Sequence, residues 1–300
     1  MVRFLLEEGD RVRVLDDLST GHRANLAGVG VELVEGDVRD LDLVRRACRG
    51  TEVVYHLAAL PSVARSLADP GTTNDVNVRG TLTVLLAARA EGVRRVVYAS
   101  SSSIYGDAPT LPKEEGMPPL PRSPYAAAKL AGEAYCRAFT ASLGLETVSL
   151  RFFNVFGPRQ DPASPYAAVI PRFASRMLAG EPPVIFGDGL QSRDFTYVAN
   201  AVRACRLAAL ADGEVAGEVV NVACGGRISL LELVALLNRI IGTHLEPVFT
   251  DPQPGDVRHS EAAIGKARRL LGYRPEVGVE EGLAETVAWL ARAAPVGGAP

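Results

Sequence analysis

Short runs of β-branched residues alternate with longer stretches of helical periodicity over the first two-thirds of the chain. The runs predict strands at residues 12–15, 31–35, 53–56, 95–100 and 146–151, and the stretches between them predict helices at 41–48, 76–90 and 125–142. Crossovers of this length join parallel strands with a right-handed turn. The pattern therefore predicts an α/β fold, a Rossmann-like doubly wound parallel sheet.

The pattern of the sequence changes after Arg151: prolines interrupt short segments, and strand-like and helix-like stretches no longer alternate. Two helices are still indicated, at 229–241 and 279–291; the first has Ser229 as N-cap and Glu232 three residues later, a capping box. We expect a larger domain at 1–155, a smaller C-terminal substrate-binding lobe formed mostly by 156–292 with some segments returning to the main domain, and a flexible tail at 293–300.

The charge distribution argues against a nucleic-acid-binding protein. The net charge is −3 and charged residues make up 22% of the chain, so no basic field exists to hold a polyanion. The densest basic spots are two arginine pairs, Arg94–Arg95 and Arg268–Arg269, which we interpret as solvated ends of helices or strands. No nucleic-acid partner is expected.

The cysteines and the apolar runs exclude further classes. No two cysteines have a C-x-x-C spacing, so neither a zinc site nor a disulfide framework is indicated, and we expect reduced, buried thiols at Cys48, Cys136, Cys205 and Cys224. No apolar run approaches the roughly 20 residues that span a bilayer, and the N-terminus lacks the plan of a signal peptide. A cytoplasmic location without a membrane partner is expected.

A run of hydroxyl side chains follows the fourth predicted strand, at residues 100–103. Open α/β sheets bind ligands at the carboxyl ends of their strands. Downstream, Tyr125 and Lys129 lie four residues apart on a predicted helix and so share one face. A phenol with a pKa of about 10 is a poor base, but an ammonium group one turn away favours its ionised form. Tyr125 is thus a candidate base for a substrate hydroxyl, with a strand-terminal serine sharing the proton.

Together with the Tyr125–Lys129 spacing, eight further motifs in this order resemble the extended short-chain dehydrogenase/reductase family, in its NAD-dependent epimerase/dehydratase branch, and within it the UDP-sugar 4-epimerases. The resemblance covers nearly the whole chain. The motifs are LDDLSTG at 15–21, GDVRD at 36–40, HLAA at 56–59, NVRGT at 77–81, LRFFNVFG at 150–157, GDG at 187–189, RDF at 193–195 and GDVRHS at 255–260.

The resemblance implies NAD as the cofactor. Asp16 would bind the adenosine ribose, where a carboxylate repels the 2′-phosphate of NADP. Asp37 and Val38 would border the adenine, and Asn77 the nicotinamide half. The other cofactor-binding positions that the resemblance implies are Leu57, Ala58 and Ala59 on the pyrophosphate and ribose side, together with Tyr125, Lys129 and Phe153.

The resemblance also implies the substrate contacts. Ser101 lies four residues before the tyrosine of a Tyr-Gly pair, which makes it the proton-sharing serine and a substrate contact. Ser102 and Ser103 stand where the sugar 4,6-dehydratases carry Asp and Glu, which argues against dehydration. Asn154 and Arg193 match contacts to the nucleotide diphosphate. Positions around the uracil are matched by Val169, Val184 and Phe186.

Two further positions concern the sugar and the diphosphate. The small Ser260 stands where a bulky aromatic restricts the pocket of some 4-epimerases, so we expect space for an N-acetyl group. Gln253 stands where an arginine usually holds the diphosphate, and Arg258 is expected to compensate.

The implied reaction is the NAD-dependent 4-epimerisation of a UDP-hexose through a 4-keto intermediate, with Ser101, Tyr125 and Lys129 as catalytic residues. The substrates would be UDP-glucose and UDP-galactose or their N-acetyl forms, and a homodimer is expected through the helices at 76–90 and 125–142. A UDP-glucuronate decarboxylase, or another nucleotide-sugar oxidoreductase of this fold, is the first alternative.

The start of the chain departs from the family pattern. Residues 3–9 read like the helix that follows a strand and a G-x-x-G-x-x-G turn in the family, and no other segment supplies that turn. Either the true start lies about 20 residues upstream, from the length of a strand, a turn and half a helix, or the chain is a non-catalytic nucleotide-sugar-binding remnant.

Overall fold

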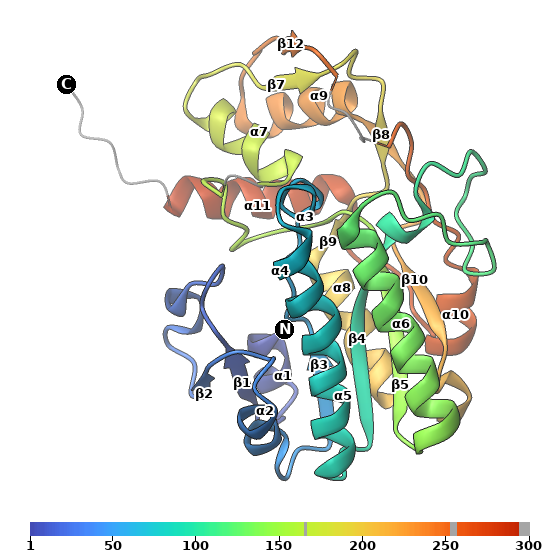
Figure 1. Ribbon diagram of the computed structural model, residues 1–300. Coiled ribbons are helices and arrows are strands. Elements are labelled where there is room, and N and C mark those ends of the chain that lie inside the picture. The colour runs from blue at the N-terminus through green and yellow to red at the C-terminus, as the bar shows by residue number, and fades with distance from the viewer. Residues whose placement is uncertain (165–166, 253–256, 294–300) are drawn as a thin grey trace.

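The computed structural model describes residues 1–164, 167–252 and 257–293 (Figure 1). Gln253 and the predicted tail beyond residue 293 lie outside the described residues. The last described helix, α11 (Val279–Ala293), runs two residues further than its prediction.

Two groups of parallel strands form the centre of the larger part of the molecule. The main sheet has the order β10-β5-β4-β3, and β1 pairs with β2 separately. Among the described strands, none pairs with the second edge of β1 or with the outer edge of β3. The bounds are β1 (Arg13–Asp16), β2 (Glu32–Glu35), β3 (Val53–His56), β4 (Arg95–Ser101), β5 (Glu146–Phe152) and β10 (Val219–Val222). The predicted Rossmann-type α/β fold is confirmed.

Helices cover both faces of the main sheet, because successive residues of a strand point to opposite sides. On β4, Val96 packs with α2 (Leu41–Cys48), α5 (Gly80–Ala90) and α6 (Pro124–Leu143). Its neighbour Val97 packs on the other face with α8 (Val198–Leu210) and α10 (Gly265–Leu271). Figure 1 shows α5 and α6 side by side in front of the sheet. These two layers make the sheet doubly wound.

A third apolar cluster lies outside the main sheet, at the top of Figure 1. Phe173, Leu233 and Leu283 bring together α7 (Val169–Leu178), α9 (Leu230–Ile241) and α11. The remaining elements are α1 (Val2–Glu7), α3 (Val63–Ala68), α4 (Pro70–Asn74), β6 (Val155–Phe156), β7 (Val184–Phe186), β8 (Ser192–Arg193), β9 (Thr196–Tyr197), β11 (Ile228–Ser229), β12 (Val248–Thr250) and the single turns η1 (Arg23–Leu26), η2 (Asp75–Arg79), η3 (Ser102–Tyr105) and η4 (Gly213–Val215).

The ends of the helices follow their capping chemistry. Ser229 and Glu232 form the predicted capping box at the start of α9. At α6, the Ser123 hydroxyl accepts a hydrogen bond from the Ala126 amide, and Gly144 ends the helix at a φ of 73°. The helix predicted at 76–90 is regular only from Gly80, because η2 before it is a single π-helical turn.

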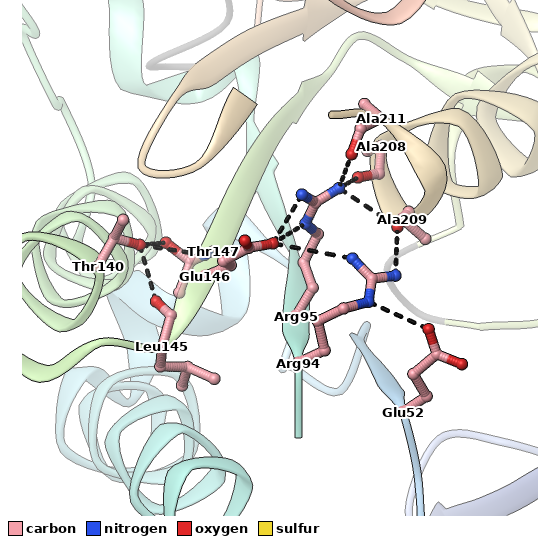
Figure 2. A network of polar contacts seen from close by, with 10 residues as sticks. All are labelled: Glu52, Arg94, Arg95, Thr140, Leu145, Glu146, Thr147, Ala208, Ala209 and Ala211. Atoms are coloured by element: carbon pink, nitrogen blue, oxygen red, sulfur yellow. Dashed lines mark hydrogen bonds and ion pairs between the residues drawn. The ribbon is translucent and has the colours of Figure 1, made fainter. Parts of the chain in front are cut away.

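The predicted solvation of the arginine pairs is correct for Arg268 and Arg269 and wrong for Arg95. Arg95 is 1% exposed and pairs with Glu146 (Figure 2). The last carbonyls of a helix have no intrahelical donor, and Arg95 supplies one at the end of α8. Its Nη1 donates to the carbonyl oxygens of Ala208 at 2.9 Å, Ala209 at 3.2 Å and Ala211 at 2.6 Å.

All four cysteines are free thiols, and Cys48, Cys136 and Cys205 are buried as predicted, whereas Cys224 is half-buried. Burial raises the pKa of Cys48 to about 11, which keeps it protonated at neutral pH. None of the described helices combines the length and the apolar composition that crossing a membrane requires.

Candidate active site

The three candidate catalytic residues meet at the carboxyl end of β4. Ser101 is the last residue of β4, and Tyr125 and Lys129 occupy the first two turns of α6. The Ser101 hydroxyl is close enough to Tyr125 to lower the pKa of its phenol in part. Lys129 Nζ lies 5.9 Å from the centroid of the Tyr125 ring and donates to the Ala99 carbonyl at 2.7 Å. A phenol, a hydroxyl and an ammonium group thus share one site, which suits proton transfer to and from a substrate hydroxyl.

Burial sets the ionisation of this group. It raises the pKa of Tyr125, which the neighbouring Ser101 hydroxyl only partly offsets, and it lowers the pKa of Lys129 to about 8. In the chain alone, without the cationic nicotinamide ring, the pKa of Tyr125 thus lies above its usual value. The cause is desolvation, which disfavours both the phenolate and the ammonium.

The serines of the run differ in their partners. Ser101 Oγ accepts hydrogen bonds from the Ser103 amide at 3.2 Å and from Ser103 Oγ at 2.9 Å, so that Ser101 also caps η3. The buried Ser100 donates instead to Glu133 Oε1 at 2.5 Å. Of the four serines, Ser101 is the one that acts on the pKa of Tyr125.

A buried ion pair that the sequence analysis missed lies beneath the site. Glu133, one turn after Lys129 on α6, receives hydrogen bonds from Nε and Nη2 of Arg151, both at 2.8 Å. The guanidinium carbon of Arg151 also lies 4.7 Å from the centroid of the Tyr105 ring. Since Ser100 on β4 binds the same carboxylate, one ion pair ties β4, β5 and α6 together. The signal available in the sequence was the i, i+4 spacing of Lys129 and Glu133 on one helix face.

The slot around Lys129 is buried and tightly packed. Lys129 is 3% exposed, with Nζ 5.1 Å from the centroid of the Tyr98 ring. Burial lowers the pKa of the neighbouring His56 to about 3, so the imidazole is neutral, and its Nε2 lies 2.9 Å from Thr81 Oγ1. A Cβ at Gly132 would lie 2.2 Å from the Tyr98 hydroxyl, so α6 can approach β4 this closely only with glycine there.

Several predicted cofactor residues lie at the carboxyl ends of strands. Asp16 ends β1, and its Oδ1 accepts from the Leu18 amide at 2.8 Å. Asp37 follows β2 and is paired with Arg39, which lowers the pKa of the carboxyl. The segment 57–59 follows β3, with Leu57 46% exposed. These positions line the end of the sheet at which α/β folds bind ligands.

Three other predicted cofactor positions have buried side chains. Val38 packs within the core beside Gly80. The Asn77 side chain is engaged with the backbone of Leu60, accepting from its amide at 2.8 Å and donating to its carbonyl at 3.2 Å. The Phe153 ring is completely buried against Tyr105. The side chains of Asn77 and Phe153 thus support the loop after β3 and the core.

The residues present fit NAD at two places. The Asp16 carboxylate offers an acceptor for ribose hydroxyls at the end of β1. The Lys129 ammonium has three N–H donors. Among the described residues it donates one hydrogen bond, to the Ala99 carbonyl, so donors remain for a second ribose. This donor and acceptor set matches a dinucleotide with a ribose at each end.

A cavity of about 290 Å³ lies between α7, β7 and β8. Its wall contains five of the seven residues predicted to bind substrate, namely Asn154, Val169, Val184, Phe186 and Arg193. Ser101 pairs in register with Phe152 of β5, two residues before Asn154, so the cavity and the catalytic group adjoin the same pair of strands. Arg172 and Gln191 also line the cavity and were missed by the sequence analysis.

Arg258, which was predicted to bind substrate, does not lie in the wall of this cavity. Its guanidinium forms two hydrogen bonds with Asp188, at 3.0 and 2.7 Å, and it does not line the cavity. Its backbone carbonyl accepts from Arg193 Nη1 at 3.3 Å. In this structure Arg258 therefore supports Arg193 through its backbone, and its charge is directed to Asp188.

A buried carboxylate next to Arg193 was also missed. Asp194 is fully buried and accepts hydrogen bonds from the amides of Cys224 at 3.0 Å, Gly225 at 3.1 Å and Ala262 at 3.2 Å. Burial nevertheless raises its pKa to about 6. Asp194 thereby joins the strand that carries Arg193 to the end of β10 and to the segment after Ser260.

Comparisons with known proteins agree with this geometry. The model of the NAD dependent epimerase/dehydratase family matches residues 1–223. A UDP-glucose 4-epimerase of Mycolicibacterium smegmatis is 41% identical over 294 residues, which cover 96% of this chain and 93% of that protein.

Two solved structures share the fold. The UDP-glucose 4-epimerase of Thermotoga maritima with UDP-glucose superposes with a TM-score of 0.93 at 38% identity, covering 97% of this chain and 94% of that one. The UDP-N-acetylglucosamine 4-epimerase of Methanobrevibacter ruminantium M1, in complex with UDP-N-acetylmuramic acid, has a TM-score of 0.90 at 39% identity, covering 94% and 91%.

Proposed function

The chain belongs to the NAD-dependent epimerase/dehydratase family, and from this premise we propose that it is a UDP-hexose 4-epimerase. The observation that carries the proposal is the meeting of Ser101, Tyr125 and Lys129 at the carboxyl end of β4, on the strand pair that also leads into the cavity at Asn154. The substrates are UDP-glucose and UDP-galactose or their N-acetyl forms.

NAD, when bound, takes up the C4 hydride of the sugar and returns it. Asp16 holds the adenosine ribose, and Lys129 holds the ribose at the other end with the N–H donors that Ala99 leaves unused. Asp37 and the segment 57–59 border the cofactor between these two points. The carboxylate of Asp16 favours NAD over NADP by repelling a 2′-phosphate.

Tyr125 moves the proton of the C4 hydroxyl. In its phenolate form it accepts this proton as the C4–H bond breaks, which leaves a 4-keto sugar, and it returns the proton when the hydride is delivered to the opposite face. Ser101 shares the same oxygen and can relay the proton. The ammonium of Lys129 offsets part of the cost of forming a phenolate in a buried site.

The nucleotide end of the substrate is held in the cavity. Arg193 and Asn154 bind the diphosphate, since a guanidinium forms charge-assisted hydrogen bonds with phosphate oxygens. Val169, Val184 and Phe186 surround the base. The small Ser260 leaves room for an N-acetyl group, which is why both the plain and the N-acetylated sugars are proposed.

We further propose that residues 1–155 form the NAD-binding domain and that 156–292 form most of the substrate lobe. The protein is proposed to act in the cytoplasm as a homodimer through α5 and α6. Support for the dimer comes from large apolar side chains exposed on these adjacent helices, Leu86 on α5 and Tyr135 and Leu143 on α6.

An epimerase assay with a matched pair of variants tests the proposal. UDP-glucose should be converted to UDP-galactose, and Tyr125→Phe should lower kcat by at least about 100-fold, because it removes the acid–base group. Tyr135→Phe changes an exposed tyrosine of the same helix and should leave kcat unchanged. Near-normal turnover by Tyr125→Phe, or no turnover of any of the four UDP-hexoses by the wild type, would refute the proposal.

A further inference from the structure

Arg172 lies in the wall of the cavity, and no carboxylate of residues 1–164, 167–252 or 257–293 pairs with it. It lies in the first turn of α7, three residues after Val169, and is half-buried. Its guanidinium carbon is 5.4 Å from the centroid of the Phe186 ring. Among the residues that the structure describes, no hydrogen-bond acceptor or carboxylate pairs with Arg172, whereas Arg176, one turn later, binds Glu181 and the Pro182 carbonyl.

The surroundings of Arg172 suit a flat, partly polar ligand. Val169, Val184 and Phe186 give this side of the cavity an apolar surface with one aromatic ring. A guanidinium over an aromatic ring keeps its N–H groups in its own plane, so its donors remain free at the edge. Arg172 is half-buried, so its donors are accessible from the cavity, and carbonyl oxygens of a ligand are acceptors that suit them.

A nucleobase meets these requirements better than a diphosphate does. The polar side of the cavity is formed by Asn154 and Arg193, whose neighbours are backbone carbonyls and the buried Asp194. Arg172 lies instead with the ring and the aliphatic side chains. Phosphate oxygens therefore suit the Arg193 side, and the planar base suits the Arg172 side.

We infer that Arg172 is a specificity residue that reads the carbonyl edge of a pyrimidine dione. It donates to the C4 carbonyl oxygen of uracil, where cytosine carries an amino group that cannot accept a hydrogen bond from the guanidinium. This inference rests on the proposed function, since it concerns the base of the same UDP-sugar. It adds a contact that selects the uridine nucleotide over the cytidine one.

Calorimetric titration of the full chain with UDP and with CDP tests the inference. The wild type should bind UDP more tightly than CDP. Arg172→Met should weaken UDP binding roughly 10- to 100-fold, the value of one hydrogen bond to a charged donor, and should weaken CDP binding far less. Arg172→Gln should act in the same direction and provides a second variant. Arg176→Met, on the same helix but away from the cavity, should bind both nucleotides as the wild type does.

The ratio of the two dissociation constants decides the outcome. A ratio that falls towards one in both Arg172 variants, with unchanged melting temperature, supports base reading. A ratio that stays at the wild-type value overturns it, whether both affinities are unchanged or both fall equally, as a phosphate contact would make them. If the wild type binds neither nucleotide, the proposed function itself fails, which is distinguishable from failure of the Arg172 inference alone.

Discussion

Replacing Arg95 by methionine tests how much a buried guanidinium contributes to this fold. Arg95 is 1% exposed, and its Nη1 serves three carbonyls at the end of α8 while Nε and Nη2 bind Glu146 at 2.9 and 2.7 Å (Figure 2). In Arg95→Met the carbonyls of Ala208 and Ala211 lose this donor, whereas the Ala209 carbonyl keeps its hydrogen bond from Arg94. Methionine fills much of the aliphatic volume, so the polar loss is what the substitution measures.

The expected magnitude follows from the two kinds of partner. Breaking a buried charge pair costs about 3–5 kcal/mol, but the Glu146 side chain is 37% exposed, so water can replace part of its loss. The carbonyl of the fully buried Ala208 has no such replacement, and each unmade hydrogen bond of a buried group costs about 1–3 kcal/mol. We expect Arg95→Met to lower the free energy of unfolding by about 3 kcal/mol.

Arg94→Met is the matched control, because Arg94 precedes Arg95 directly and makes similar bonds at the surface. It pairs with Glu52 and donates to the Ala209 carbonyl, but its side chain is 38% exposed. Exposed pairs contribute less than about 1 kcal/mol. Urea unfolding of both variants gives the comparison. If Arg95→Met were as stable as Arg94→Met, the bonds at the end of α8 would contribute nothing and the reasoning would be wrong.

Three further predictions concern the site and its supports. Lys129→Met should lower epimerase activity at least about 100-fold. The folded pKa of Lys129 is about 8, against 10.5 ordinarily, so the wild type should gain stability relative to this variant as the pH rises from 8 to 10.5. Equal pH profiles of unfolding for the two proteins would contradict this. The folded pKa of Asp194, raised to about 6 from 3.8, means that its contribution to stability is fully present below pH 3.8 and is lost as the pH rises through 6; Asp194→Asn should remove this dependence from the unfolding profile. Gly132→Ala should cost about 1–3 kcal/mol in urea unfolding, since its Cβ would meet the Tyr98 hydroxyl at 2.2 Å, whereas Gly265→Ala, with open space at its Cβ, should cost nothing measurable.

The catalytic group and the elements that carry it could be predicted because their signals are local. The strand at 53–56 and the helix at 41–48 agree with their predicted bounds, since hydrophobic periodicity is read within a few residues. The spacing of Tyr125 and Lys129 sufficed to place both on one face of α6. Ser101 needed the resemblance to choose it among four serines, because a run of identical side chains carries no local signal that separates them.

The buried charges and the cavity could not be predicted from local patterns. Arg95 looks like any charged residue at a strand end, and what buries it is the end of α8, 113 residues away at Ala208. Arg172 lies on the amphipathic helix α7, and the cavity that it lines forms only where α7 and β7 come together in the folded chain. Phe153 and Asn77 lie within family motifs, yet their side chains turn to the core and to a loop backbone.

The sequence by itself determined the alternation of strands and helices, the parallel sheet and the spacing of the catalytic pair. These depend on residues two to four positions apart, whose side chains share a face whatever the rest of the chain does. Only the tertiary structure decided which charges are buried, which side chains line the cavity and in which direction the pKa of Tyr125 moves. Those properties depend on desolvation and on partners far away in the sequence, which come together only when the chain has folded.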